Sequence, residues 1–295
     1  GYDTHGLPTE KKAIQALGIN RDEISVSKFR DTCKDFALGY VDKQTEGFKR
    51  LGVLGDWEHP YITLQPELEA NQIKIFAEMY KKGYIEKGLK PVYWCASCET
   101  ALAEAEVEYA DHTSTSIYVR FKFDDEGVNK IKQLVNIPND NVYAVIWTTT
   151  PWTLPSNVAL CVNAAEEYSK VKSNDGKVYI LATALLDTVL GEGNYEVVET
   201  YRGQDLVNTE YEPLFDYANP DKKAYYVVED PYVTLTDGTG IVHIAPAFGE
   251  DDANVGRRFD LPFVQLVNDQ GKFTKEVEGL EGVFVKDGDK EILKR

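Results

Sequence analysis

Three consecutive threonines lie beside two tryptophans in the run WTTTPWTLPSN at residues 147–157. The apolar, β-branched residues 142–146 before it predict a buried strand, and Pro151 cannot donate a hydrogen bond to a sheet ladder. The threonines are therefore expected where a strand leaves its sheet. An isolated triplet of threonines is more often only a strand former on a pleated surface, but the flanking tryptophans and prolines make that interpretation less fitting here.

A second group of chemically capable residues lies in GTGIVHIAPAFGEDD, at residues 238–252. A short strand flanked by glycines delivers His243, and a loop then delivers three carboxylates. Glycine permits a close backbone approach to a ligand, and His and Asp side chains can orient water or hold a cationic amine. Each residue also has an ordinary interpretation, since a lone His at a strand end is usually satisfied by the backbone and an acidic run often begins a solvated helix.

A third pattern is the pair Cys95 and Cys98 in YWCASC. Tetrahedral zinc needs four ligands, and this pair supplies two, so any zinc knuckle is incomplete in this chain. Cys161 lies in an apolar run and is expected in the core. A redox role lacks the βαβ pattern that usually surrounds such a motif.

Composition limits the class of protein. With 295 residues and 43% hydrophobic content, the chain can form one large domain or two of moderate size. The sequence shows no membrane span and no signal peptide, and four cysteines in a chain of this length do not suggest a disulfide framework, so a cytoplasmic location is expected. The formal net charge of −17 repels a polyanion at long range, so any nucleic acid must be held locally.

The first hundred residues carry mainly helical signals. One predicted helix contains apolar residues at 3.6-residue spacing from Phe29 to Tyr40 and ends near Leu51 and Gly52. A second is predicted over residues 66–82, with Ile73, Phe76, Ala77 and Tyr80 on one face.

From about residue 113 the pattern changes to the alternation of half-buried strands. Strands are expected at 117–123, 142–148, 158–162, 177–181, 224–228 and 240–244, with one short helix near 182–190. This pattern predicts an α+β fold in which a β-rich, barrel-like domain is inserted after a helical stem. The expected division is a mainly helical segment at 1–112, the β-rich domain at 113–285 and the start of a return linker at 286–295.

Four motifs, in the right order, resemble the class I isoleucyl-tRNA synthetases. Residues 1–8, GYDTHGLP, resemble the GWDxHGLP segment of that family, and residues 101–109 match its ALAEAEVEY segment. The threonine run resembles the WTTTPWT motif of the family's editing domain, known as CP1, and residues 238–252 resemble its GTGxVHxAPxxGxDD motif. Valyl and leucyl relatives typically carry TTRP at the threonine position, so this resemblance favours the isoleucyl branch.

The departures from the family pattern restrict what the resemblance implies. Neither the HIGH nor the KMSKS signature is present, so the chain is expected to be a fragment that cannot activate an amino acid with ATP, although residues 1 to about 60 resemble part of the Rossmann-type catalytic fold. The second Cys-x-x-Cys of the family's zinc knuckle is also expected outside this chain. Ala247 and Phe248 replace the Gly-His of many bacterial members, so no role is assigned to that histidine.

The activity implied by the resemblance is hydrolysis of valine wrongly esterified to isoleucine tRNA, the 3′ end of which would be the partner. Such hydrolysis is needed because an isoleucine pocket cannot strongly exclude a side chain one methylene smaller, so a second site removes the smaller amino acid; this is the standard example of double-sieve editing. A monomer is expected, with no membrane contact. The complete enzyme would ligate isoleucine to its tRNA with ATP.

The resemblance also assigns roles to individual residues. Asp252 would bind the α-ammonium of the substrate, and His243 would shape the pocket and contact the terminal ribose. The threonine hydroxyls would contact the aminoacyl group or the terminal adenosine and position the water. Asn157 would support the adenosine or the loop. Trp147 and Trp152 would stack on the terminal adenine, although both indoles are equally consistent with packing. The catalytic set is thus Thr148, Thr149, Thr150, His243 and Asp252.

Neither a covalent intermediate nor a catalytic metal is expected for this hydrolysis, because none of these side chains is a strong base or nucleophile at neutral pH. Asp3 would bind the amino group of isoleucine in the synthetic site and is expected to be idle in this chain.

Two alternatives stay open: a valyl- or leucyl-type editing domain, and a tRNA-end binding module without turnover. A serine hydrolase is not supported, since the sequence has no G-x-S-x-G.

Overall fold

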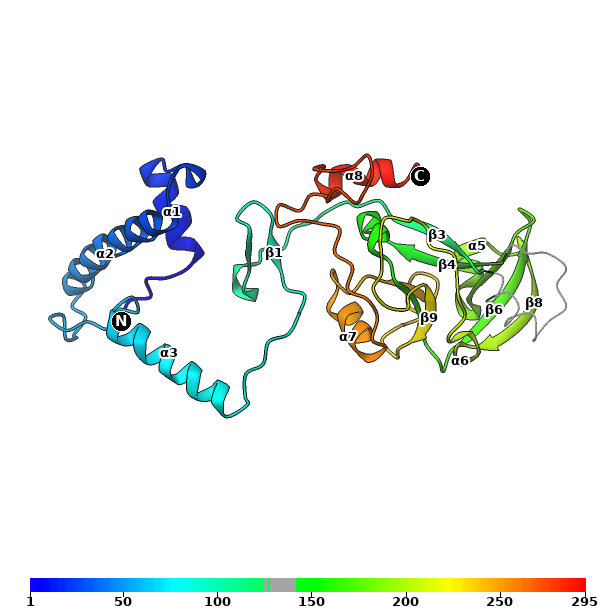
Figure 1. Cartoon of the computed structure of the whole chain (residues 1–295), viewed down its shortest axis with the longest axis horizontal. Helices are drawn as coiled ribbons and strands as arrows, with labels where there is room; N and C mark the ends of the chain where they lie inside the picture. The colour runs from blue at the N-terminus through cyan, green and yellow to red at the C-terminus, as the bar shows by residue number, and fades with distance from the viewer. Residues whose placement is uncertain (125–126, 128–141) are drawn as a thin grey trace. The chain divides into compact units, whose positions relative to one another are not determined.

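The computed structural model describes residues 1–124, 127 and 142–295. The chain folds into two compact units, unit 1 at Gly1–Gly88 and unit 2 at Leu89–Arg295, which we describe separately (Figure 1). The predicted division at 112/113 falls inside unit 2. The predicted division of the chain into a helical segment, a β-rich domain and a linker stays a prediction.

Unit 1 is helical. Its elements are α1 (Leu7–Leu17), the 3-10 turn η1 (Arg21–Glu23), α2 (Val26–Arg50) and α3 (Pro66–Lys81). Helix α2 begins after Ser25, whose hydroxyl accepts a hydrogen bond from the Lys28 N–H, which is a usual N-cap. Both predicted helices are confirmed in position. A small core joins Tyr2 and Ile62, which form an isolated parallel bridge, to Val41.

The apolar face predicted for α3 is not buried. No residue of α3 is buried, and Ile73, Phe76 and Tyr80 are 69%, 59% and 64% exposed. The periodicity therefore identified the helix but not its environment, because a pattern of apolar residues does not supply the surface against which they pack.

Unit 2 contains ten strands among its described residues, in three sheets. A five-stranded sheet has the order β3-β4-β7-β6-β8, a three-stranded sheet the order β10-β5-β9, and β1 pairs with β2. The strands are β1 (Trp94–Cys95), β2 (Thr100–Ala101), β3 (Ile117–Lys122), β4 (Val142–Thr148), β5 (Ala159–Val162), β6 (Glu167–Ser173), β7 (Val178–Ala182), β8 (Tyr195–Arg202), β9 (Tyr226–Glu229) and β10 (Ile241–Ile244). The helical pieces are η2 (Glu104–Glu106), η3 (Pro151–Ser156), η4 (Thr183–Leu185), α5 (Leu186–Leu190), α6 (Gly203–Leu206), α7 (Glu250–Arg258) and α8 (Val285–Ile292).

All six predicted strands are confirmed within a few residues, and the mixed content of helix and sheet agrees with the predicted class. Four strands were missed: the two-residue strands β1 and β2, and the longer strands β6 and β8. Among the described residues the sheets of unit 2 do not close on themselves, so the barrel stays a prediction. The Rossmann-type segment predicted near the start of the chain also stays a prediction. The start of the predicted linker at 286–295 falls in α8, which packs on η3.

The main core of unit 2 lies between the two larger sheets. Phe121, Ile146 and Ile180 from the five-stranded sheet are fully buried with Leu160 and Ile244 from the three-stranded sheet. Strands β4 and β10, from different sheets, are in contact. This packing brings the end of β4 and the strand that carries His243 into the same region.

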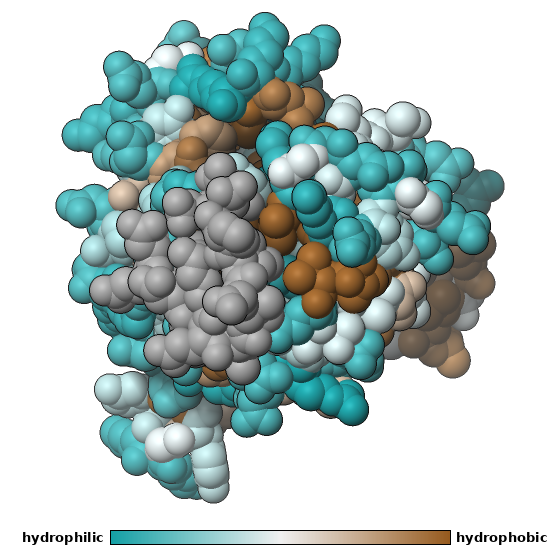
Figure 2. Space-filling model, turned by 90° about the vertical axis from the view of Figure 1, so that its right-hand side faces the viewer, coloured by the Kyte–Doolittle hydropathy of each residue, from teal (hydrophilic) through white to brown (hydrophobic). Residues whose placement is uncertain are grey.

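The opposite face of the five-stranded sheet has a smaller apolar cluster that includes Val145, Tyr179 and Leu181. Figure 2 shows the surface that faces right in Figure 1, which is mostly hydrophilic with a few apolar patches. None of the described helices is both long and apolar enough to cross a bilayer.

Candidate functional site

The threonine run begins where the sequence predicts, at the point where β4 ends. Thr148 is the last residue of β4 and is buried, whereas Thr149 and Thr150 are exposed. The Thr148 hydroxyl accepts a hydrogen bond from the Thr150 N–H at 3.1 Å, and the two hydroxyl oxygens are 3.3 Å apart. The 3-10 turn η3 starts at Pro151, which fixes this turn of the backbone.

Thr153, which the sequence analysis did not select, connects the two motifs. Its Oγ1 is 3.0 Å from Nε2 of His243, a residue 90 positions away in the chain. The same hydroxyl donates to the carbonyl of Thr150 at 2.9 Å. Because a hydroxyl has one proton, this geometry is satisfied when His243 carries its proton on Nε2 and donates to Thr153. We call this line from His243 through Thr153 to Thr150 the threonine–histidine link.

His243 is buried and neutral at physiological pH. Burial lowers its pKa to about 4, because the charged imidazolium would lose its hydration. Its Nδ1 is buried and has no hydrogen-bond partner among the described residues. With the proton on Nε2, this nitrogen is an acceptor that a bound hydroxyl or water could satisfy.

Asp252 lies in the first turn of α7, at the helix N-terminus. Burial raises the pKa of its carboxyl to about 7, against the opposing effect of a hydrogen bond from the backbone of Ala245. Ala245 directly follows the strand that carries His243, so the carboxylate lies near the same strand end. A Cβ on Gly249 would lie 2.5 Å from Oδ2 of Asp252, so this carboxylate needs a glycine beside it. A cationic ligand would favour its ionised form.

Cys161 is buried in β5, as predicted, and burial raises the pKa of its thiol.

Tyr232 is half-buried, and its hydroxyl is enclosed without a hydrogen-bond partner among the described residues. Burial raises the pKa of this phenol, with a further contribution from the charge of Asp252. No motif in the sequence distinguishes Tyr232 from the other tyrosines, of which the chain has 18.

Asn157 is buried, and its amide is engaged with the protein. Its Nδ2 donates to the carbonyl of Ala159 at 2.9 Å, and its Oδ1 accepts from the Tyr211 hydroxyl at 2.6 Å. These bonds hold the chain between η3 and β5. The geometry favours the supporting role for Asn157 over direct contact with adenosine.

The two tryptophans of the run differ. Trp152 is partly buried and meets Phe248 edge to face, with 5.0 Å between ring centroids and 77° between ring planes, which is a packing geometry. Trp147 is 36% exposed and lies against Gly238, at the start of the His243 motif. Trp147 is therefore better placed than Trp152 for a ligand.

The cysteine pair lies in the β1–β2 hairpin, with Cys95 in β1 and Cys98 in the turn that follows. No cluster of three or more potential metal ligands occurs in the part of the chain that the structure describes. Two thiols alone do not complete the tetrahedral zinc set.

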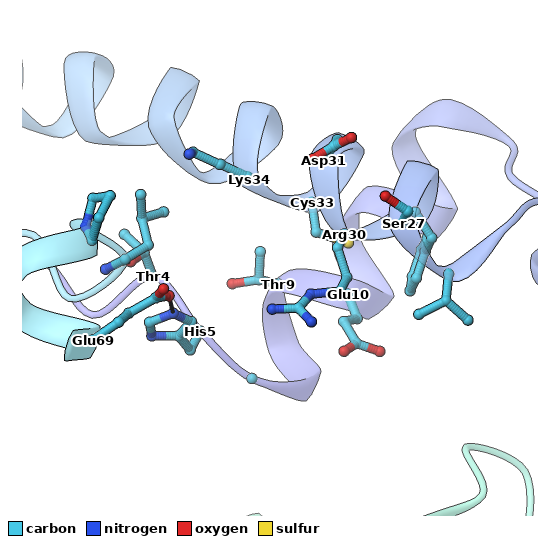
Figure 3. Close-up of a pocket in the computed structure, with 15 residues that line it drawn as sticks. Thr4, His5, Thr9, Glu10, Ser27, Arg30, Asp31, Cys33, Lys34 and Glu69 are labelled. Carbon is cyan, nitrogen blue, oxygen red and sulfur yellow. Dashed lines mark hydrogen bonds and ion pairs between the residues drawn. The ribbon is translucent and has the colours of Figure 1, made fainter. Parts of the chain in front are cut away.

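Unit 1 has its own cavity of about 580 Å³, shown in Figure 3. His5 lies at its edge, with Nε2 3.1 Å from a carboxylate oxygen of Glu69. Asp3 is exposed and is not among the residues that line this cavity. Asp3 thus belongs to unit 1, and its role in binding isoleucine stays a prediction.

Comparison with known proteins identifies the family. Residues 1–253 match the family model described as tRNA synthetases class I (I, L, M and V). The chain belongs to this family. The residues of the threonine–histidine link and Asp252 all lie within the matched residues 1–253. The candidate site is therefore inside the part of the chain that matches the family model.

Similar curated relatives include bacterial isoleucine–tRNA ligases. The chain is 49% identical over 99% of its length to that of Thermoanaerobacter sp. (strain X514), and 48% identical over its full length to that of Lactobacillus acidophilus. It spans about a third of these relatives, 31% of each.

Solved structures of synthetase segments show a partial likeness. GlLeuRS-CP1 covers 61% of the chain, with 94% of its own length aligned, at a TM-score of 0.48 and 12% identity. The editing domain of the P. knowlesi cytosolic leucyl-tRNA synthetase covers 49% of the chain and 62% of its own, at a TM-score of 0.38 and 18% identity. Both TM-scores are below 0.5.

Proposed function

We propose that unit 2 is the editing site of an isoleucyl-type synthetase and hydrolyses the ester of valine on isoleucine tRNA. The observation that carries this proposal is the threonine–histidine link, since it joins two distant motifs at one place. Asp252 lies at the end of the same strand that supplies His243. A neutral imidazole beside a carboxylate suits an ester that carries an ammonium group.

In the proposed reaction, water attacks the carbonyl carbon of the ester. The bond from that carbon to the ribose oxygen breaks, the ribose oxygen takes one proton of the water, the other proton is released to solvent, and valine leaves as its carboxylate. His243, with a pKa of about 4, is too weak a base to remove a full proton from water, so its role is to hold water or a ribose hydroxyl. The hydroxyls of Thr148, Thr149 and Thr150 help to orient the same groups. The chain then needs no covalent intermediate.

Asp252 would recognise the α-ammonium of valine. A half-buried carboxylate with a pKa of about 7 in the empty site gains its charge when a cation binds, through a charge-assisted hydrogen bond. Trp147 would stack on the terminal adenine, and Asn157 would hold the turn. Exclusion of isoleucine would follow from the size of the pocket.

The complete protein, of which the chain spans about a third, would ligate isoleucine to its tRNA with ATP in the cytoplasm and act as a monomer. Asp3 and the unit 1 cavity would then belong to the synthetic half, and Cys95 and Cys98 would supply two ligands of a zinc knuckle. We also propose that the β-rich domain at residues 113–285 has a barrel-like architecture.

Ester loss from valyl-tRNA of the isoleucine type tests the function. We expect the chain to accelerate this loss above the buffer rate. Asp252→Ala should slow it by about tenfold to a hundredfold, because a hydrogen bond to a charged group is lost. Asp251→Ala is the matched control, since Asp251 is the exposed neighbour on the same helical turn.

Two outcomes would contradict the proposal. Ester loss no faster than in buffer, with the tRNA bound, would favour the binding module without turnover. Equal loss in the Asp252 and Asp251 variants would move the ammonium site elsewhere.

A further inference from the structure

Three segments of unit 2 that lie far apart in the sequence meet at η3. Trp152 of η3 directly precedes Thr153, the residue that contacts His243 in the threonine–histidine link. The ring of Trp152 meets Phe248, in the loop between β10 and α7, edge to face. The same turn also contacts α8, the red helix of Figure 1. The position of η3 therefore depends on α8 as well as on the two motifs of the candidate site.

Helix α8 is packed firmly into unit 2. Its buried residues are Val285, Gly288 and Ile292, and their spacing of three and four residues places them on one side of the helix. Val285 and Ile292 belong to the main core of unit 2. Gly288 allows a close approach, since a Cβ there would lie 2.6 Å from the ring of Phe273. A helix packed in this way can serve as a fixed support for a neighbouring turn.

The carboxyl group of Asp289, on α8, reaches the backbone of η3. Burial raises the pKa of this carboxyl, whereas a hydrogen bond from the backbone of Trp152 and the positive charge of Lys286 act in the opposite direction. One oxygen of the group, Oδ1, is enclosed and has no hydrogen-bond partner among the described residues. Trp152 is the second residue of η3, and the first N–H groups of a helical turn have no acceptor inside it. Asp289 therefore supplies an acceptor that η3 lacks.

The turn that Asp289 contacts carries the threonine–histidine link. The Thr153 N–H donates to the carbonyl of Thr150 at 3.1 Å, and the Thr153 hydroxyl donates to the same carbonyl. That hydroxyl is also 3.0 Å from Nε2 of His243. Hydrogen bonds weaken steeply when their geometry is disturbed, so a shift of the Trp152 backbone would weaken the contact of the next residue with His243.

We propose that Asp289 is a positioning residue for the editing site: its carboxyl accepts the Trp152 N–H, holds η3 against α8 and thereby keeps Thr153 in contact with His243. In this role Asp289 makes no contact with the ester. The inference rests on the proposed function for its effect on hydrolysis, whereas the hydrogen bond to η3 can be measured without a substrate. It gives a task to a helix that lies outside the matched residues 1–253.

Rates on valyl-tRNA of the isoleucine type measure the effect on hydrolysis. Asp289→Ala removes the acceptor and should lower kcat about tenfold with KM unchanged, because the groups around the ester lose their alignment while the tRNA contacts stay. Asp289→Asn keeps an oxygen that can accept the N–H, so its kcat should stay within about threefold of the wild-type value. Asp287→Ala is the matched control, since Asp287 is an exposed acid on the same helix.

A double-mutant cycle separates positioning from a general loss of stability. If Asp289 acts through Thr153, adding Asp289→Ala to Thr153→Val should lower kcat by no more than about a further threefold, because the link is already broken. Losses that multiply in full would show that the two residues act independently and would overturn the inference. A wild-type kcat in Asp289→Ala, or an Asn variant as slow as the Ala variant, would also overturn it and leave the editing function intact.

Amide hydrogen exchange of the whole chain tests the hydrogen bond without a substrate. The Trp152 and Thr153 N–H groups should be protected in wild type and in Asp289→Asn, and should exchange at least about tenfold faster in Asp289→Ala while β4 is unchanged. An unprotected Trp152 N–H in wild type, or equal protection in all three proteins, would show that Asp289 does not hold η3. Equal acceleration throughout β4 would reduce Asp289 to general stability and overturn the positioning role. A wild-type chain that hydrolyses no valyl-tRNA would contradict the proposed function instead.

Discussion

Units 1 and 2 differ in how fully their apolar residues are buried. The strands of unit 2 contain fully buried residues such as Leu160, Ile180 and Ile244, whereas α3 of unit 1 has none. The same sequence signals, apolar residues at regular spacing, occur in both. Burial is what turns such a pattern into stability, so unit 2 can hold a preorganised site, and unit 1 has much less buried surface with which to do so.

The largest expected effect tests this contrast through the core of unit 2. Leu160→Ala should lower the free energy of unfolding of unit 2 by about 2–5 kcal/mol, because a cavity remains where a fully buried side chain is removed. Urea unfolding followed by the fluorescence of the tryptophans would measure it. Leu160→Met, which conserves volume, should cost less than about 1.5 kcal/mol. Equal losses for both variants would show that this position is not tightly packed.

The next effect tests the threonine–histidine link. Thr153→Val keeps the shape of the side chain but leaves Nε2 of His243 buried without its partner, which costs about 1–3 kcal/mol. If that cost falls on the positioning of His243, ester hydrolysis should slow by about tenfold or more. Initial rates on valyl-tRNA would measure it, with Thr153→Ser as the control that keeps the hydroxyl. A Val variant as active as the Ser variant would remove the link from the mechanism.

The third effect is a dependence of stability on pH, from two groups that act in opposite directions. The folded-state pKa of Asp252 is raised to about 7, so the folded protein binds this proton more tightly, and the contribution of Asp252 to stability falls as pH rises from about 4 to about 7. The folded-state pKa of His243 is lowered to about 4, so its contribution falls as pH drops from about 6.5 to about 4.

Asp252→Asn isolates the first of these groups. The variant should be more stable than wild type by about 1–3 kcal/mol at pH 7, and the difference should shrink as pH falls and vanish below about pH 3, where the carboxyl is protonated in both states. Thermal unfolding at a series of pH values would show this trend. Asp251→Asn, at an exposed position, should show no such trend. A constant difference across the series would mean that Asp252 does not titrate in this window.

The sequence predicted much of the fold because most elements have strong local signals. Helix α3 carries Pro66 at its start and Gly83 just past its end, α2 is followed by Gly52, and β3 and β4 alternate or run apolar. Strand β6 was missed because it buries a lysine, Lys170, and a serine, Ser169, which break the usual apolar pattern. Strand β8 was missed because only Tyr201 in it is buried, and its two valines, Val197 and Val198, are adjacent and exposed, so no apolar alternation marks it.

The candidate site was predictable in its motifs but not in its contacts. His243 and the threonines were selected from sequence, yet nothing local shows that Thr153 meets His243 across 90 residues. Asn157 was selected because an amide side chain can bind a ligand, and only the fold shows that this amide is hydrogen-bonded to Ala159 and Tyr211. Periodicity likewise could not show that the apolar face of α3 is exposed.

The smallest expected effect completes the comparison in unit 1. Phe76→Ala should change the free energy of unfolding by no more than about 0.5 kcal/mol, because the ring is 59% exposed and its removal leaves no cavity. Phe29→Ala in α2 is the contrasting control, since Phe29 is buried and should cost about 3 kcal/mol or more in unit 1. Far-ultraviolet circular dichroism during urea unfolding would follow both variants. If Phe76→Ala cost as much as Phe29→Ala, the face of α3 would be packed in solution, and unit 1 would resemble unit 2 in burial.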